Sequence, residues 1–390
     1  MTTSQSTAGL RPRRRRLRRI AGSALAALVV LGLVAVGLGS WVGSSLLLDP
    51  HHQLLRDSVQ VEQVGGGRVV LEHTHTSARQ GTYGLDWPRG HAIVGDVVAV
   101  GPATVTRELR QGSGSLSAGT KVAIDPDVWT TDPRTALGIA FTDVAVADPL
   151  GPMPAWQVTG RGSTWVIFVH GIDGSRAGGL RPLGTLHQAQ LPTLLISYRN
   201  DVRAPPSPDG LIHLGMTEWQ DLDAAAAYAL AHGAEHLVLY GDSMGGAIVM
   251  RFMTQSERAS RVVGLVLDAP VLDWASVLDR QAARFHLPFL AGPIQWMISR
   301  RIQVSWPALD ALTTAGYLGV PVLLFQGLDD QLVAPATSET FAARVPHARA
   351  TYVPVAGAGH IESWNVNPGD YERHLAAFLA RLGLNNPSSG

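Results

Sequence analysis

A Gly-x-Ser-x-Gly pattern, centred on Ser243, joins the apolar run 236–239 to the helical stretch 247–254, and this junction constrains the fold more than any other feature. A serine at a strand-to-helix turn needs a strained backbone, and Gly241 and Gly245 let neighbouring segments approach without a Cβ clash. Such a turn lifts the serine hydroxyl clear of the sheet. The pattern alone is weak evidence in a chain with 42 glycines, where an ordinary turn is the alternative. Whether the pattern marks a catalytic serine or an ordinary turn therefore depends on the sequence around it.

That context is an alternation of apolar strands and helices from residue 163 onward. Strands are expected at 164–169, 193–198, 237–240, 262–267, 320–325 and 350–355, and helices at 177–188, 217–232, 247–254, 338–344 and 371–382. Strands that are apolar along their whole length are typical of a parallel sheet covered on both faces. Ligands of such sheets bind beyond the carboxyl ends of the strands, and the motifs considered below follow such ends.

Ser243 at its ordinary pKa is a poor nucleophile, so it needs a base, and the base needs an orienting acid. On a sheet with this elbow the partners follow in the chain order serine, acid, histidine. Three histidines come late enough, namely His347, His360 and His374. His360 lies in a glycine-rich loop that leaves a strand, whereas the other two are expected at a helix exit and on the closing helix. Loops on a rigid sheet favour catalysis, so His360 is the predicted base.

Three aspartates are candidates for the acid. Asp329 and Asp330 follow the strand at 320–325, although two adjacent aspartates are also typical of a plain turn. One of them is expected to accept the Nδ1–H of His360, and the other to cap the turn or face water. Asp273 follows the preceding strand and is the third candidate.

The oxyanion that develops during acyl transfer needs two backbone N–H donors. One is expected from Met244, directly after the nucleophile at the start of its helix. The other is expected from Ile172, in the turn that follows the strand at 164–169. His170 in the same turn is interpreted as a structural residue rather than a base.

Four motifs together resemble the α/β-hydrolase superfamily, and are most similar to its serine aminopeptidase, monoacylglycerol-lipase-like and prolyl-oligopeptidase-like branches. They are His170-Gly171, Gly241-Asp242-Ser243-Met244-Gly245-Gly246, Gly327-x-x-Asp330-x-x-Val333 and Gly359-His360. The resemblance covers about residues 153–383. It implies acyl transfer to water through an acyl-enzyme, on a small-molecule acyl substrate, with no metal or organic cofactor. Its Gly-x-x-Asp-x-x-Val pattern favours Asp330 over Asp329.

The N-terminal region predicts a membrane anchor. Seven arginines lie between residues 11 and 19, and an uncharged segment begins at Ile20 and ends at Ser40. A helix of that length spans about 31 Å, which matches a bilayer core, and Trp41 follows it as an interfacial anchor would. A cleaved signal peptide and a buried core helix are the alternatives. The arginines are expected to stay in the cytoplasm, which places the catalytic domain outside it in a single-pass membrane protein. Because the apolar segment abuts the arginines directly, nucleic-acid binding is not expected.

Residues 49–150 predict a β-rich extension, with strands at 68–72, 91–100, 119–124 and 142–147 between Gly/Pro turns. Its histidines have no ligand-like spacing, and we interpret them as exposed residues rather than a metal site: His51, His52, His73 and His75. The chain has no cysteine, which excludes disulfides and a thiol enzyme.

An insertion at 275–319, rich in apolar residues at helical spacing, is expected to form a helical cap whose inner face lines the acyl site. Simple packing is the alternative. Arg199, at another strand end, could bind a substrate carboxylate, but a local salt bridge with Asp201 is the preferred interpretation.

The sequence therefore predicts four parts: a basic cytoplasmic tail (1–19), a transmembrane anchor (20–48), a β-rich extension (49–150) and an α/β-hydrolase domain (151–385). The fold class is α/β, a mostly parallel sheet with helices on both faces. The expected activity is cleavage of a carboxylic ester, lipid esters included. A serine peptidase or amidase of the same fold is the alternative, followed by an inactive hydrolase-fold binding module.

Overall fold

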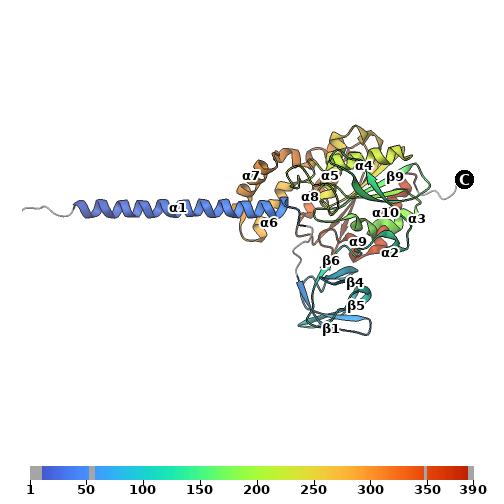
Figure 1. The fold of residues 1–390 in the computed structure, drawn as a ribbon, viewed down its shortest axis with the longest axis horizontal. Helices are drawn as coiled ribbons and strands as arrows, with labels where there is room; N and C mark the ends of the chain where they lie inside the picture. The colour runs from blue at the N-terminus through green and yellow to red at the C-terminus, as the bar shows by residue number, and fades with distance from the viewer. Residues whose placement is uncertain (1–10, 52–57, 347–348, 385–390) are drawn as a thin grey trace, which may run out of the picture.

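The structure is a computed structural model that describes residues 11–51, 58–346 and 349–384. A long N-terminal helix, α1, projects from an α/β body, and a small β-barrel lies beside that body (Figure 1). Of the histidines considered above, His52 and His347 lie outside the described residues, and so do the side chains of the arginine run.

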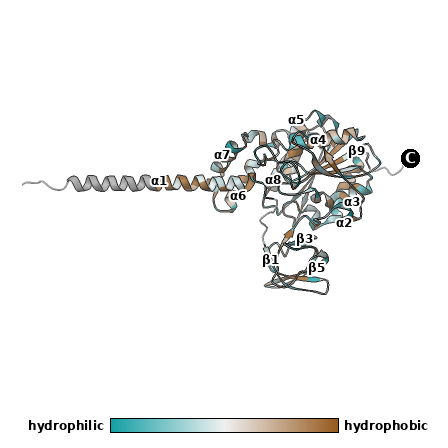
Figure 2. Ribbon diagram, viewed as in Figure 1, coloured by the Kyte–Doolittle hydropathy of each residue, from teal (hydrophilic) through white to brown (hydrophobic). Residues whose placement is uncertain are grey.

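Helix α1 covers Arg11–Leu48 and is longer than the apolar segment predicted from the sequence. Within the part whose side chains are described, Leu28–Leu48 is long and apolar enough to cross a membrane, and most of it is brown in Figure 2. The last residue of α1 is anchored in the body, because Leu48 is fully buried and its carbonyl accepts the Ile212 N–H at 2.8 Å.

Six antiparallel strands close the barrel in the order β1-β2-β5-β4-β3-β6. They are β1 Ser58–Gly65, β2 Arg68–Glu72, β3 Tyr83–Trp87, β4 Gly90–Val100, β5 Thr104–Ser113 and β6 Lys121–Asp125. The inward positions alternate along β1 and β2, so that Val59, Val61, Val69 and Leu71 form its core with residues of the other strands. The sequence predicted β2, β4 and β6 but missed β1, β3 and β5.

The body is built on an eight-stranded sheet in the order β14-β13-β12-β11-β9-β10-β8-β7. Its strands are β7 Thr142–Val146, β8 Met153–Val158, β9 Thr164–Val169, β10 Thr193–Ile196, β11 His236–Asp242, β12 Val262–Asp268, β13 Val322–Gly327 and β14 Ala350–Val355. All pairings from β14 to β10 are parallel, whereas β8 and β7 are antiparallel additions at one edge. The strand at 142–147, assigned to the extension from the sequence, is β7 and belongs to this sheet.

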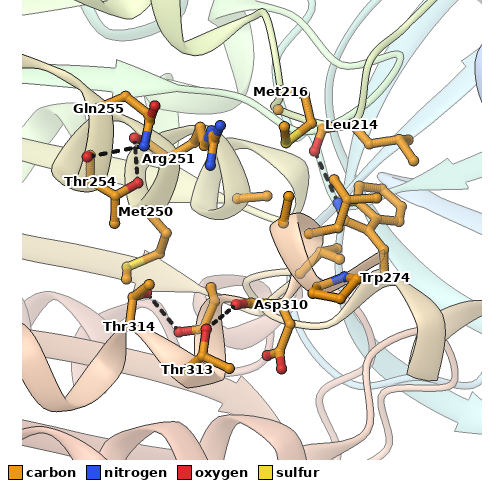
Figure 3. Close-up of a pocket in the computed structure, with 17 residues that line it drawn as sticks. Leu214, Met216, Met250, Arg251, Thr254, Gln255, Trp274, Asp310, Thr313 and Thr314 are labelled. Carbon is orange, nitrogen blue, oxygen red and sulfur yellow. Dashed lines mark hydrogen bonds between the residues drawn. The ribbon is translucent and has the colours of Figure 1, made fainter. Parts of the chain in front are cut away.

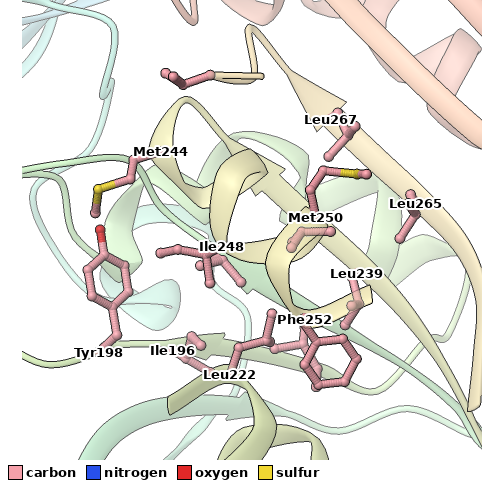
Figure 4. Packing of buried hydrophobic residues seen from close by; sticks show 14 of the residues in the cluster. Ile196, Tyr198, Leu222, Leu239, Met244, Ile248, Met250, Phe252, Leu265 and Leu267 are labelled. Atoms are coloured by element: carbon pink, nitrogen blue, oxygen red, sulfur yellow. The ribbon is translucent and has the colours of Figure 1, made fainter. Parts of the chain in front are cut away.

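Helices cover both faces of the sheet, as the fold class predicted. They are α2 Pro133–Leu137, α3 Leu180–Gln188, α4 Trp219–Ala231, α5 Met244–Gln255, α8 Pro335–Arg344, α9 Ser363–Val366 and α10 Pro368–Arg381. One apolar core joins the sheet to α4, α5 and α8 through residues such as Leu222 and Ile248 (Figure 4), and a second joins it to α3 and α10 through Leu183 and Phe378. Because both faces are buried, the sheet holds the loops at its carboxyl edge in fixed positions.

The insertion between β12 and β13 is helical. It contains α6 Trp274–Arg284, η3 Pro288–Leu290, α7 Ala291–Arg301, η4 Trp306–Leu309, η5 Ala311–Thr313 and η6 Ala315–Tyr317. Its apolar residues do not form a single inner face. Leu290 and Ile294 pack against α1, and Phe285, Leu287, Phe289 and Trp296 are exposed.

Candidate active site

Ser243 occupies the sharp turn between β11 and α5, with φ 49° and ψ −119°, a conformation that non-glycine residues rarely adopt. Neighbouring chain leaves no space for side chains at the two flanking glycines. A Cβ at Gly245 would lie 2.0 Å from the Val169 carbonyl oxygen, and one at Gly241 would lie 2.5 Å from the Gly245 carbonyl oxygen. The glycines are therefore required by the close approach of β9 and α5 to the serine.

The structure brings Ser243, His360 and Asp330 together. Nε2 of His360 lies 2.8 Å from Oγ of Ser243, and Nδ1 of the same ring lies 2.8 Å from Oδ2 of Asp330. Asp330 follows β13 and His360 follows β14, so three strand ends of one sheet supply the three side chains. In this arrangement the serine hydroxyl can donate to Nε2 while Nδ1–H donates to the carboxylate.

Asp330 is completely buried, and its second oxygen, Oδ1, accepts the backbone N–H groups of Leu332 at 2.8 Å and Val333 at 2.9 Å. Burial alone would raise the pKa of this carboxyl group, but His360 and the two N–H donors hold its pKa below the ordinary value. Asp330 is therefore an anion at neutral pH, with one oxygen fixed by the turn and the other by the imidazole.

The other sequence candidates lie elsewhere. Asp329 is exposed, and the carboxylate that contacts the imidazole of His360 is that of Asp330. Asp273 caps helix α6, where its carboxylate accepts the N–H of Ala275 at 3.0 Å. His374 lies on α10, 3.7 Å from Asp370.

The pKa of His360 is set by two opposing effects. Its burial disfavours the imidazolium ion, but the adjacent Asp330 carboxylate stabilises that ion, and the net effect raises the pKa above its ordinary value. A base of this kind accepts a proton from a serine hydroxyl more readily than an unassisted imidazole does.

The loop after β9, which carries Ile172, is held close to the nucleophile. A Cβ at Gly171 would lie 2.8 Å from Cβ of Ser243. The Gly171 carbonyl accepts the Tyr198 hydroxyl at 2.9 Å and the Nδ1–H of His170 at 2.8 Å. The other nitrogen of that buried ring, Nε2, lies 2.7 Å from Asp201. His170 thus fixes the loop, in agreement with the structural role expected for it.

The prediction of a salt bridge between Arg199 and Asp201 is wrong. Arg199 forms a two-point ion pair with Asp221 on α4, at 2.7 and 2.9 Å. The carboxylate of Asp201 instead contacts Nε2 of His170 and accepts the backbone N–H of Tyr198. The sequence could not show this, because Asp221 is 22 residues away and reaches Arg199 only through the packing of α4 on β10.

The buried charged residues close to Ser243 were also not predicted from the sequence. Asp242 precedes Ser243, and its Oδ2 accepts a hydrogen bond from Arg181 of α3 at 3.1 Å. Burial raises the pKa of Asp242 to about 7, although Arg181 opposes the shift. Asp268 at the end of β12 accepts the hydroxyl of Ser363 at 3.0 Å, and burial raises its pKa to about 6.

The barrel contacts the loop that carries His360. Glu362 accepts the N–H of Gly359 at 2.9 Å through one oxygen and pairs with Arg79 through the other. Asn365 donates to the carbonyl of Thr82, at 2.8 Å. Apart from Gly359, none of these residues belongs to a motif in the sequence, so no local signal could have predicted the contact.

A cavity of about 200 Å³ lies between α5 and the η4–η5 segment, lined by Met250, Arg251, Trp274 and other residues shown in Figure 3. Trp274 bounds it, and its Nε1 donates to the Leu214 carbonyl at 3.1 Å. The lining includes none of the three residues Ser243, Asp330 and His360. Across the described parts of the chain, no group of three or more His, Cys, Asp or Glu residues is arranged to hold a metal ion.

Comparisons with known proteins support this description. The family model for serine aminopeptidases, S33, matches residues 216–311, and a model for a domain of unknown function, DUF8805, matches residues 60–125. The chain is similar in structure to a Pyrococcus furiosus esterase, Pf2001. In one crystal form the TM-score is 0.54, with 19% identity over 65% of this chain and 95% of the esterase. In another it is 0.52, with 20% identity over 65% and 96%. No curated protein matches the sequence.

The sheet order and the elbow show that the chain has the α/β-hydrolase fold, and residues 216–311 match the serine aminopeptidase family of the α/β-hydrolase superfamily. The chain is an α/β-hydrolase-type enzyme that carries, in addition, an apolar N-terminal helix and a small β-barrel.

Proposed function

We propose that the protein is a serine hydrolase that cleaves carboxylic esters through an acyl-enzyme. The observation that carries this proposal is the chain of two 2.8 Å contacts from Ser243 through His360 to Asp330. A strained elbow presents the serine, and a buried carboxylate orients the imidazole.

In the proposed mechanism, Oγ of Ser243 attacks the ester carbonyl while Nε2 of His360 takes its proton. Asp330 holds Nδ1–H and stabilises the imidazolium that forms. The backbone N–H groups of Ile172 and Met244 stabilise the oxyanion of the tetrahedral intermediate. His360 then protonates the departing alcohol, and water, activated by the same imidazole, attacks the acyl-enzyme and releases the acid.

A serine peptidase or amidase is the second candidate, because the matching family model is that of serine aminopeptidases. The same residues would serve either reaction. The two differ in the leaving group, since an amine must be protonated before it departs and an alcohol is a better leaving group.

We further propose that α1 anchors the enzyme in the cell membrane with the catalytic domain outside the cytoplasm. The arginine run precedes the apolar helix, and such residues stay on the cytoplasmic side. Reporter fusions after Gly390 test this topology, and a fusion active only as a cytoplasmic reporter contradicts it.

The reaction is tested by measuring kcat/KM of the full chain on p-nitrophenyl esters of increasing acyl length and on aminoacyl p-nitroanilides, with Ser243→Ala as the background control. We expect turnover of esters to exceed that of amides and to disappear in Ser243→Ala. Turnover of amides alone would establish the peptidase, and equal rates in wild type and Ser243→Ala would contradict both candidates.

A further inference from the structure

Helix α7 of the cap packs directly against α1. Side chains of the cap lie where glycines of α1 offer room: a Cβ at Gly39 would lie 3.4 Å from Leu290, and one at Gly43 would lie 2.7 Å from Ile294. Small residues let two helices approach closely. The cap is therefore attached along α1 over at least one helical turn, from Gly39 to Gly43.

Polar contacts fasten the same interface at its body end. Arg301, near the end of α7, donates to the hydroxyls of Ser44 at 2.9 Å and Ser45 at 3.0 Å, and pairs with Asp49 at 2.8 Å. Its guanidinium also lies over the ring of Trp41, 4.5 Å from the centroid. These contacts fix α7 relative to the axis of α1, so the position of the cap along that axis is determined.

The position of the cap along α1 determines its depth in the bilayer. A hydrocarbon core of about 30 Å requires about 20 helical residues. If the span begins at Ile20, directly after the arginines, it ends near Ser40. Gly39 then lies inside the outer edge of the hydrocarbon, and Leu290, which contacts Gly39, lies at the same depth.

Several large apolar residues near Leu290 in the sequence are exposed. We call residues 285–296 the cap tip. Its exposed side chains are Phe285 (68% exposed), Leu287 (42%), Phe289 (63%) and Trp296 (58%). A concentration of large exposed apolar side chains is uncommon in soluble proteins and marks a surface that interacts with a partner. The tip flanks α1 where that helix leaves the body (Figure 1). Apolar side chains of α1 next in sequence to Gly39 and Gly43, namely Leu38 and Val42, are exposed as well.

The segment that directly follows α1 contacts the loop next to the nucleophile. Just after α1, the backbone N–H of His51 donates to the carboxylate of Asp173 at 3.0 Å, one residue beyond Ile172. A small cavity is lined jointly by Pro50, Asp173 and Met244. The end of the membrane helix thus contacts the loop that carries the expected oxyanion donor.

We propose that the cap tip is inserted into the outer leaflet of the same bilayer that α1 spans, so that the active site opens beside the lipid surface. The partner of this surface is the lipid bilayer itself. This inference rests on the proposed ester hydrolysis. The substrate class that it predicts is an ester of a lipid that resides in the outer leaflet.

Because the chain has no cysteine, single cysteines report their surroundings without background. The full chain is reconstituted in phosphatidylcholine–phosphatidylglycerol vesicles with a nitroxide at Phe289→Cys. Leu33→Cys on α1 is the bilayer control, and Glu235→Cys, exposed at the amino end of β11, is the water control. We expect the label at 289 to be relaxed more by oxygen than by a water-soluble nickel chelate, as at 33. A label at 289 that behaves as at 235 would overturn the insertion, whatever the enzyme hydrolyses.

The proposal that the substrate is a lipid ester within the membrane is tested by a separate measurement. The triple variant Phe285→Ser, Phe289→Ser and Trp296→Ser changes only exposed side chains and leaves Ser243, His360 and Asp330 intact. We expect at least a tenfold loss of activity on a fluorogenic phospholipid or diacylglycerol ester within vesicles, and less than a twofold change on p-nitrophenyl acetate in solution. Equal losses on both would overturn the membrane-presented substrate. Absence of all esterase activity in the wild type would instead refute the proposed function and leave the spin-label result standing.

Discussion

Arg79 of the N-terminal barrel pairs with Glu362, and the same carboxylate accepts the backbone N–H of Gly359, directly before His360. The Glu362 side chain therefore links the barrel to the loop of the expected catalytic base. Arg107 stiffens the barrel side of this contact, since it is completely buried and donates to the carbonyls of Ser77 and Gly81.

Replacing Glu362 with Gln is expected to lower kcat/KM on a soluble ester by roughly 10- to 100-fold, because a small displacement of His360 is enough to disturb proton transfer. Arg79→Met is expected to reproduce most of this loss. Glu339→Gln, on the exposed side of α8, is the matched control and is expected to leave the rate unchanged. Wild-type activity in both Glu362→Gln and Arg79→Met would show that the barrel contact does not position the base.

The acid assignment is tested by comparing three carboxylates on one ester. Asp330→Asn is expected to lower kcat/KM by roughly 10³- to 10⁴-fold, because an amide favours the wrong imidazole tautomer. Asp329→Asn is expected to cost less than about tenfold, since Asp329 is exposed. Asp273→Asn is expected to have a similarly small effect, because asparagine caps a helix about as well as aspartate. A larger loss at Asp329 or Asp273 than at Asp330 would show that the acid is misassigned.

The pH dependence of kcat/KM follows from the raised pKa of His360. Only the neutral imidazole can accept the serine proton, so activity is lost as pH falls through the pKa of His360. Because that pKa is raised, we expect the acid limb of the profile to have a midpoint above about 6.5, the ordinary histidine value. A midpoint below that value would contradict the stabilisation of the imidazolium by Asp330.

The buried ion pair between Arg199 and Asp221 predicts a change in stability. Arg199→Met removes one partner and leaves the Asp221 carboxylate buried without its cation, which is expected to destabilise the protein by about 3 kcal/mol. Arg203→Met, at an exposed neighbouring position, is the control. Thermal unfolding followed by circular dichroism measures both, and equal melting temperatures would contradict the importance of the pair.

The order of the strands from β9 to β14, and of the main helices between them, could be predicted from the sequence because these strands are largely apolar and each motif follows a strand end. Strand β8 was missed, and β7 was assigned to the N-terminal extension. Strand β14, predicted at 350–355, has those bounds in the structure. The barrel was harder, since β3 and β5 are interrupted by glycines and charged residues and are defined mainly by their pairing. The pattern around Gly327 favoured Asp330, and this is the aspartate whose Oδ2 lies 2.8 Å from Nδ1 of His360.

Contacts between distant parts of the chain could not be predicted. The packing of α7 on α1 joins residues more than 250 positions apart, and it depends on Gly39 and Gly43, whose spacing is also common in ordinary membrane helices. The same limit applies to Arg79 and Glu362, whose separation is 283 residues. Apolar residues at helical spacing in the cap predicted a helix, but not which of its faces would be covered.

The most direct test of the account is the site of covalent modification by a fluorophosphonate, read by peptide mass spectrometry on the full chain. We predict a single adduct on Ser243, no adduct in Ser243→Ala, and loss of ester turnover to below roughly a hundredth of the wild-type rate in that variant. Labelling that persists in Ser243→Ala, or a variant that retains more than that rate, would contradict the assignment of Ser243 as the nucleophile.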